Sequence, residues 1–211
     1  MKGKFIVFEG IDGSGKTTQI NQISKWLIGT NIIPKSNQLV ITREPGGTNL
    51  GKSIRSLLLD TSSGKNPDSI TELLLYAADR SQHVNEIIRP SLNKGDWIIS
   101  DRFSGSTLAY QGYGRKVDIK LIKDLETIAT QGISPDITFL PYIPVEESMK
   151  RRINRKDDRI EQEGREFLSN VSLGFQALSE DRKWKKISAV NTKESIMSEI
   201  QSEIKKLIKI Y

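Results

Sequence analysis

The sequence predicts one α/β domain, built on a parallel five-stranded sheet with helices on both faces. Short apolar runs alternate along the chain with longer stretches of helical period. Strands separated by helices form βαβ units, whose parallel sheet is covered on both faces. The length of 211 residues suits a single domain over residues 1–211, with a small mobile appendage but no second full domain.

The expected elements follow this alternation from one end of the chain to the other. Strands are expected at the apolar runs that contain FIVF, LVIT, WIIS, ITFL and ISAV, which are residues 4–9, 38–42, 97–100, 136–140 and 186–190. Helices are expected at the intervening stretches with a period near 3.6, which are residues 17–28, 50–59, 69–92, 118–130, 145–155, 165–182 and 193–210. Ligands of such sheets bind at the carboxyl ends of the strands, so functional residues are expected there.

Composition excludes several classes of protein. Hydrophobic residues make up 36% and charged residues 27% of the chain, as in ordinary globular proteins. No apolar run approaches the ~20 residues of a membrane span, and the first residues do not read as a signal peptide, so we expect no membrane partner. The absence of cysteine excludes disulfides and thiol chemistry and fits a cytoplasmic location.

The formal charge of +6 is the one feature that favours a nucleic-acid partner. Lysines and arginines are scattered, however, and the only dense cluster, residues 150–159, also contains Asp157 and Asp158. Nucleic-acid modules concentrate positive charge on one face and interleave aromatic residues for stacking, and this cluster has no aromatic residue. We therefore expect no nucleic-acid partner.

Residues 10–17, GIDGSGKT, form a complete G-x-x-x-x-G-K-[ST] phosphate-binding loop (P-loop). The motif follows an apolar strand and opens a helix, a context that a simple glycine-rich turn does not require. Lys16 can serve the β- and γ-phosphates of ATP, and the Thr17 hydroxyl can ligate Mg²⁺. The predicted ATP-binding residues are Gly10, Ile11, Asp12, Gly13, Ser14, Gly15, Lys16 and Thr17.

A P-loop alone does not separate kinases from GTPases or ATPases. The strand ending at Ser100 is followed by Asp101, which can orient Mg²⁺ through water, and by Arg102, which can bind a phosphate bidentately. No N-K-x-D guanine signature occurs in the C-terminal region. The pattern therefore favours a phosphoryl-transfer enzyme over a GTPase switch.

Several further segments are similar to bacterial thymidylate kinases in identity, order and spacing. They span roughly residues 4–190 and read EGIDGSGKTT, TREPGGT, AADRSQH, DRF with STLAYQG, and DRIE. The resemblance implies an ATP-dependent kinase that phosphorylates thymidylate (dTMP) to dTDP in dTTP synthesis. It also implies Mg²⁺ as cofactor and a homodimer, with residues 69–92 as the candidate contact surface.

The resemblance implies roles for one helix face. Tyr76 and Arg80 are four residues apart and share a face. Tyr76 would stack on thymine, where the family often has Phe, and Arg80 would donate to a base carbonyl. His83, on the same face, is expected to be structural. Thr107 and Gln111, also four apart on a short helix, would contact the base or sugar.

The acceptor phosphate has its own implied set. Arg55 and Arg102 would hold this phosphate, Glu44 would lie near it or its metal, and Asp12 would face the 3′-hydroxyl or the attacking phosphate. The predicted substrate-binding residues are thus Glu44, Arg55, Tyr76, Arg80, Arg102, Thr107 and Gln111.

Residues 148–165 resemble the family's basic lid. Arg151 and Arg155 would share a helical face, and Arg152 would lie on another side. Gly13 stands where another branch of the family has an arginine, so lid arginines would supply the missing charge. The predicted catalytic residues are Lys16, Arg102, Arg151, Arg155 and Asp12.

Two other functions remain open from sequence. The first is a kinase of a different nucleoside monophosphate on the same fold, which base selection would distinguish. The second is a regulatory or nucleic-acid-binding ATPase, whose ATP hydrolysis would need no acceptor and would respond to DNA or RNA.

Overall fold

The computed structural model describes residues 3–61, 67–153 and 157–209. Its sheet has five parallel strands in the order β2-β3-β1-β4-β5, which confirms the predicted parallel α/β fold. The strands are β1 (Phe5–Phe8), β2 (Leu39–Arg43), β3 (Trp97–Asp101), β4 (Ile137–Tyr142) and β5 (Lys185–Ser188).

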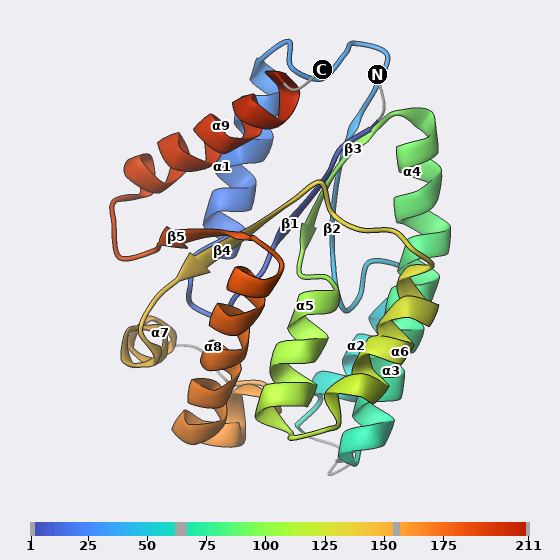
Figure 1. Cartoon of the computed structure of the whole chain (residues 1–211), viewed down its shortest axis with the longest axis vertical. Helices are drawn as coiled ribbons and strands as arrows, with labels where there is room; N and C mark the ends of the chain where they lie inside the picture. The colour runs from blue at the N-terminus through green and yellow to red at the C-terminus, as the bar shows by residue number, and fades with distance from the viewer. Residues whose placement is uncertain (1–2, 62–66, 154–156, 210–211) are drawn as a thin grey trace.

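Helices cover both faces of this sheet (Figure 1). They are α1 (Lys16–Gly29), α2 (Asn49–Leu59), α3 (Ser69–His83), η1 (Val84–Ile88), α4 (Arg89–Lys94), α5 (Ser104–Thr107), η2 (Leu108–Gly114), α6 (Ile119–Thr130), α7 (Val145–Arg152), η3 (Glu161–Glu163), α8 (Gly164–Asp181) and α9 (Lys193–Lys209). In Figure 1, α1 and α9 lie next to each other on one side of the sheet, and α3, α4 and α6 gather on the other.

The central strand β1 shows why the sheet needs both layers. All four of its residues are buried, since successive side chains of a strand point to opposite faces. Ile6 and Phe8 belong to the core that includes α1 and α9. Phe5 and Val7 belong to a second core with Val84 of η1. A strand buried on both faces reads as a continuous apolar run, which is the pattern that predicted it.

The helix expected at residues 69–92 is not continuous. The α-helical hydrogen bonding of α3 widens at η1, where the Arg89 amide donates to the carbonyl of Val84, five residues back. Pro90 lies at the start of α4 and has no amide hydrogen to continue an α-helical ladder. The change in winding therefore falls just before the proline. The helix expected at 145–155 is described to Arg152, and residues 154–156 lie outside the described part of the chain.

The carboxyl ends of three neighbouring strands meet at one edge. The register pairs Phe8 of β1 with Asp101 of β3, and Asp101 with Arg43 of β2. The P-loop follows β1, Glu44 follows β2, and Arg102 follows β3. The sheet order thus gathers the predicted site residues where ligands of parallel sheets bind.

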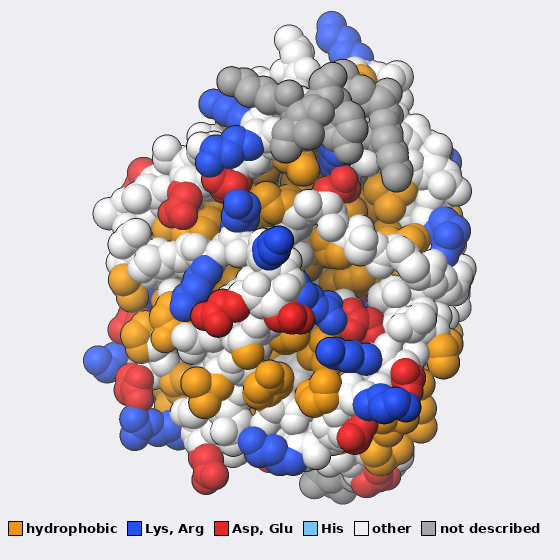
Figure 2. Space-filling model, in the orientation of Figure 1, with side chains coloured by type: hydrophobic (Ala, Val, Ile, Leu, Met, Phe, Trp, Pro, Cys, Tyr) orange, Lys and Arg blue, Asp and Glu red, His pale blue; other side chains and the backbone are white. Residues whose placement is uncertain are grey.

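Charged side chains of both signs are interspersed over the face shown in Figure 2. None of the helices in the described ranges combines the length and apolarity that crossing a membrane requires.

Candidate active site

The P-loop wraps around the amino group of Lys16. Gly10, Gly13 and Gly15 have φ of 135°, 80° and 89°, a region in which residues with a Cβ are strained. Lys16 Nζ donates to the carbonyls of Gly10 (2.9 Å) and Ile11 (3.1 Å). Burial lowers the pKa of Lys16, and the nearby Arg102 guanidinium lowers it further. The loop therefore holds a buried cation. Phosphate oxygens of a bound nucleotide can replace the two carbonyls as acceptors of its hydrogen bonds.

Some polar atoms near Lys16 have no hydrogen-bond partner in the described chain and are available to a ligand. Ser14 Oγ and Asp101 Oδ1 are buried, and neither has a hydrogen-bond partner within the described residues. The side chain of Thr17 is exposed at the start of α1. Buried polar groups are nearly always satisfied in complete structures, and these are oxygen donors suited to Mg²⁺ or phosphate. Elsewhere in the described chain, no cluster of three or more His, Asp or Glu side chains is arranged to hold a metal.

Arg102 joins β3 to the P-loop. Its Nη2 donates to both carboxylate oxygens of Asp12 (3.0 Å each), and its Nη1 donates to the Gly10 carbonyl (2.9 Å). The guanidinium also lies over the Tyr110 ring, 5.1 Å from its centroid. Arg102 has φ of 74°, a costly conformation for a residue with a side chain. These contacts offset that strain and aim the guanidinium between the loop and the pocket beside it.

The turn after β3 is organised by Glu9, which the sequence did not single out for a role. Glu9 is buried, and its carboxylate accepts from the amides of Phe103 (3.0 Å) and Ser106 (3.1 Å) and from the Ser106 hydroxyl (2.5 Å). Burial raises the pKa of Glu9, while the Ser106 hydroxyl opposes that shift. Its position just before the P-loop is the one sequence signal that could have drawn attention to it.

A second buried carboxylate, Glu44, fixes Arg80. Arg80 Nε donates to Glu44 Oε2 (2.8 Å), and Arg80 Nη2 donates to the Phe103 carbonyl (3.1 Å). His83 Nδ1 lies 2.8 Å from Glu44 Oε1, and His83 Nε2 lies 2.7 Å from Thr42 Oγ1. The structure therefore places His83 as a buried hydrogen-bonding partner, as expected. Each oxygen of Glu44 has one partner among the described residues, which leaves lone pairs for a ligand in the pocket that Glu44 lines.

The predicted substrate-binding residues come together in one pocket beside the P-loop, which we call the acceptor pocket. Its volume is about 80 Å³. Asp12 lines it too, as do residues to which the sequence assigned no role, namely Pro45, Leu59, Phe103, Ser106, Tyr110, Asp158 and Ile160. Thr107 Oγ1 is buried there without a hydrogen-bond partner in the described chain. All seven predicted residues line the pocket, namely Glu44, Arg55, Tyr76, Arg80, Arg102, Thr107 and Gln111.

Arg151 of α7 lies directly against the P-loop. Its Nη1 donates to the Gly13 carbonyl (3.3 Å), and its Nη2 donates to the Ala189 carbonyl (3.1 Å). Arg152 instead forms ion pairs with Asp157 (3.1 Å) and Glu161 (3.5 Å), away from the loop. Arg155 lies outside the described residues. Of Arg151 and Arg152, the one that lies at the phosphate loop is therefore Arg151.

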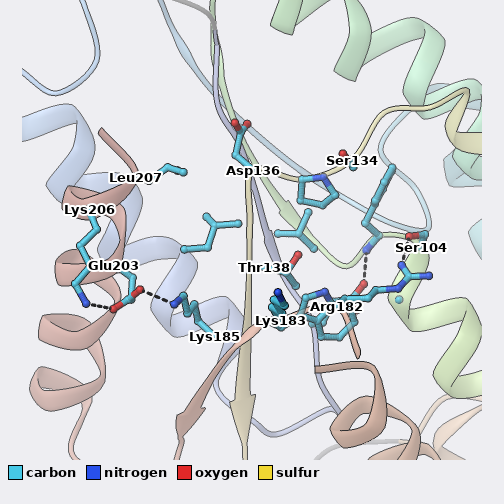
Figure 3. A pocket seen from close by; sticks show the side chains of 17 residues that line it. Ser104, Ser134, Asp136, Thr138, Arg182, Lys183, Lys185, Glu203, Lys206 and Leu207 are labelled. Atoms are coloured by element: carbon cyan, nitrogen blue, oxygen red, sulfur yellow. Dashed lines mark hydrogen bonds and ion pairs between the residues drawn. The ribbon is translucent and has the colours of Figure 1, made fainter. Parts of the chain in front are cut away.

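A larger cavity of about 560 Å³ lies elsewhere, between β4, the end of α8 and α9 (Figure 3). Lys185 and Lys206 both pair with Glu203 on one side, at 3.1 and 2.5 Å, and Arg182 approaches Ser104 on the other. None of the P-loop residues and none of the predicted substrate-binding residues lines it. The larger cavity is thus distinct from the predicted site.

A parallel sheet with a complete P-loop after its central strand, facing an arginine-rich pocket, defines a P-loop phosphotransferase. The family model described as thymidylate kinase matches residues 8–200. The chain belongs to the thymidylate kinase family and is an ATP-dependent kinase that phosphorylates dTMP to dTDP.

Individual relatives cover nearly the whole chain. A thymidylate kinase of Prochlorococcus marinus strain NATL1A is 83% identical over 209 residues, covering 99% of both chains. Another, from strain MIT 9312 of the same species, is 54% identical over 204 residues and covers 97% of this chain and 96% of its own. The crystal structure of thymidylate kinase from Ehrlichia chaffeensis superposes with a TM-score of 0.76 at 35% identity, covering 97% of this chain and 99% of that one.

Proposed function

We propose that this chain carries out ATP-dependent dTMP phosphorylation through the P-loop and the acceptor pocket described above. The observation that supports these site assignments is that the predicted acceptor-binding residues lie together. Residues from five separate segments, expected to bind one small acceptor, line a single pocket next to the P-loop. Arg102 and Asp12 are bonded to each other where the two regions meet.

The donor half of the site, by which we mean the P-loop, Asp101 and Arg151, binds the phosphates of ATP. Lys16 exchanges its two loop carbonyls for β- and γ-phosphate oxygens, and the loop amides bind the remaining oxygens. Thr17 and Asp101 would hold Mg²⁺, since one hydroxyl is exposed and one carboxylate oxygen has no partner among the described residues. When bound, the ion neutralises phosphate charge.

The acceptor half, by which we mean the acceptor pocket, binds dTMP. Arg102 and Arg55 hold its phosphate, and Asp12 keeps Arg102 aimed at the P-loop. Tyr76 stacks on the base, and Arg80 donates to a base carbonyl. The attacking phosphate oxygen is already anionic, so no general base is needed. Catalysis consists of in-line positioning and charge neutralisation.

We infer that residues 148–165 form a lid on a single domain of residues 1–211. The acceptor pocket, at about 80 Å³, is smaller than the ~300–1,000 Å³ of typical ligand pockets. Asp158 and Ile160 contribute to its wall, so movement of this segment would enlarge the pocket. Closure over both substrates would exclude water and suppress ATP hydrolysis. Arg151 and Arg155 would then neutralise charge on the transferring group.

We also propose a homodimer through α3 and its neighbours, in a cytoplasmic enzyme. Ile70 and Leu74 of α3 are about half exposed, as are Leu50 and Leu57 of the adjoining α2. Contiguous exposed apolar side chains mark interaction surfaces. Leu74→Glu should convert a dimer to a monomer in light-scattering measurements. A wild-type monomer at micromolar concentration would contradict the dimer, and cell fractionation tests the location.

The decisive experiment measures ADP release from ATP·Mg²⁺ with each of dTMP, dUMP, UMP, CMP, AMP and GMP. We expect strong stimulation by dTMP alone. Preference for another monophosphate would favour the rival kinase, and acceptor-independent hydrolysis stimulated by DNA or RNA would favour the ATPase.

A further inference from the structure

A buried carboxylate lies behind the acceptor pocket. Glu72 of α3 is fully buried, and its oxygens accept from three side chains of two other segments. Oε1 accepts from Gln111 Nε2 (2.7 Å) and Arg115 Nε (3.3 Å). Oε2 accepts from Arg115 Nη2 (3.2 Å) and from a guanidinium nitrogen of Arg159. Each carboxylate oxygen of Glu72 thus accepts two hydrogen bonds.

This environment determines which way the Gln111 amide faces. A carboxylate held by two guanidinium groups offers only acceptor oxygens, so the amide must present its NH₂ group to Glu72. The amide oxygen is then directed away from Glu72. Gln111 is itself buried and lines the acceptor pocket, and its Oε1 has no hydrogen-bond partner among the residues that the structure describes.

The pocket therefore presents one defined hydrogen-bond donor and one defined acceptor to a ligand. Arg80 is anchored through Nε and Nη2, and its Nη1 bonds to no described residue, so it remains a donor. Gln111 Oε1 is an acceptor. The Thr107 hydroxyl, buried without a partner in the described chain, can play either part and does not discriminate.

We propose that Glu72 is a positioning residue for base selection, because it locks the Gln111 amide with its oxygen toward the base. Thymine has a carbonyl at C4 beside an N3–H donor, which complements the Arg80 donor and the Gln111 acceptor. Cytosine has an amino group at C4 beside an N3 acceptor, which is the reverse pattern. An amide free to turn could present NH₂ to cytosine N3, so releasing it relaxes selection. This inference rests on the proposed assignment of the pocket to dTMP.

The test replaces the carboxylate by an amide of the same shape. In Glu72→Gln, residue 72 offers both a donor and an acceptor, so Gln111 can adopt either orientation. We expect the ratio of kcat/KM for dTMP to that for dCMP to fall about ten- to hundredfold. The change should appear in KM for the acceptors, with KM for ATP unaltered. An unchanged ratio in a folded variant overturns the proposal.

Two further variants separate positioning from general stability. Arg115→Ala removes another partner of the same carboxylate but leaves the Glu72–Gln111 bond, so it should lower Tm and keep the dTMP/dCMP ratio. In the exchange variant Glu72→Gln/Gln111→Glu, the amide at position 72 can donate to the carboxylate at position 111. That carboxylate again offers only an acceptor to the base, so the ratio should be restored. Failure of a folded exchange variant to restore it, or loss of the ratio in Arg115→Ala, counts against the proposal.

A third arm uses the unaltered enzyme, so that the inference stays testable if the variants do not fold. N3-methyl-dTMP lacks the N3–H donor, and we expect it to bind at least about tenfold more weakly than dTMP. Equal binding overturns the role of the Gln111 oxygen. If the wild type phosphorylates neither dTMP nor dCMP, the proposed function itself fails, which is a different result from loss of selectivity.

Discussion

The two halves of the site are built in opposite ways. The donor half comes mainly from one continuous stretch of chain, and two of its buried polar atoms, Ser14 Oγ and Asp101 Oδ1, have no partner in the described structure. In the acceptor half, side chains from distant segments are already bonded to buried carboxylates, as Arg80 is to Glu44 and Gln111 is to Glu72. In the acceptor half, Arg80 and Gln111 are anchored to buried carboxylates before the ligand arrives, and only single atoms such as Thr107 Oγ1 lack a partner in the described residues. In the donor half, Ser14 Oγ and Asp101 Oδ1 have no such anchor within the described ranges.

This difference predicts different costs of substitution. Removing a donor-half side chain takes away chemistry but breaks few buried contacts. Removing Arg80 from the acceptor half takes a charged partner from the buried carboxylate of Glu44, which is destabilising. Activity and stability should therefore separate in the donor half and fall together in the acceptor half.

The largest effect is expected for Lys16→Ala. This change removes the cation proposed to serve the β- and γ-phosphates, and it should abolish phosphoryl transfer with every acceptor, while dTMP binding by calorimetry stays near wild type. Lys120→Ala, which alters an exposed lysine of α6, is the matched control and should keep full activity. Near-normal turnover in folded Lys16→Ala would remove the P-loop assignment.

Arg151→Ala should have the next largest effect. Arg151 contacts the Gly13 carbonyl and can compensate charge that develops on the transferring group. An arginine in this role is worth ~10³–10⁵ in rate. Because Arg155 is proposed to share the role, the single variant should lower kcat by ~10²–10³ with Michaelis constants little changed.

Two variants sharpen this prediction. Arg151→Lys should restore activity only partly, since lysine lacks the planar fork. Arg165→Ala breaks an exposed pair with Glu146 and should leave kcat unchanged. Wild-type turnover in the Arg151→Ala/Arg155→Ala double variant would show that the cluster is only a solvated helix face.

Arg80→Ala tests the acceptor half. A charged hydrogen bond to a desolvated carbonyl contributes ~1.5–3 kcal/mol, so dTMP affinity should fall roughly ten- to hundredfold while ATP affinity is retained. Tm should fall as well, because the buried Glu44 loses its guanidinium partner and keeps only His83. Arg182→Ala breaks a less buried pair with Glu126 outside the pocket and shows what loss of an arginine–carboxylate pair does to stability alone. Loss of ATP affinity with intact dTMP affinity would contradict the assignment of α3 to the base.

The same contrast explains how much the sequence revealed. The five strands and the P-loop are local patterns, so all were predicted, with boundaries shifted by a residue or two. The roles of the buried Glu9 and Glu72 were not predicted, because the partner of Glu9 lies 94 residues away at Phe103 and that of Glu72 lies 39 away at Gln111. No periodicity encodes such pairs, which form only once the sheet order is set. The prediction of one continuous helix over 69–92 was wrong at η1, although its cause, Pro90, is visible in the sequence.

The smallest predicted effect concerns Asp79, which supports the turn after β2. Its Oδ1 accepts from the Gly46 amide (3.0 Å), and its Oδ2 is buried without a partner in the described residues. Burial raises the pKa of Asp79 to about 6, from an ordinary value of 3.8, and the Glu44 carboxylate adds to the rise. The turn after β2 is thus supported by an acid whose ionisation opposes folding near neutral pH.

The sign follows from proton binding. Between pH 3.8 and about 6 the folded state holds a proton on Asp79 that the unfolded state has released, so the free energy of unfolding falls as pH rises through this range. From pH 5 to pH 7 this group should lower wild-type stability by about 1 kcal/mol, and Asp79→Asn should lack that slope while keeping an acceptor for Gly46. Urea unfolding of both proteins at pH 5, 6 and 7 measures the difference.

Asp68→Asn is the matched control. Hydrogen bonds from Thr71 lower the pKa of the exposed Asp68 carboxyl, so the stability that Asp68 contributes is lost only as pH falls below its ordinary range. The slope of the Asp68→Asn variant between pH 5 and 7 should therefore match wild type. Parallel curves for wild type and Asp79→Asn would mean that Asp79 is ionised in the folded protein at pH 5, and that its burial carries no such cost.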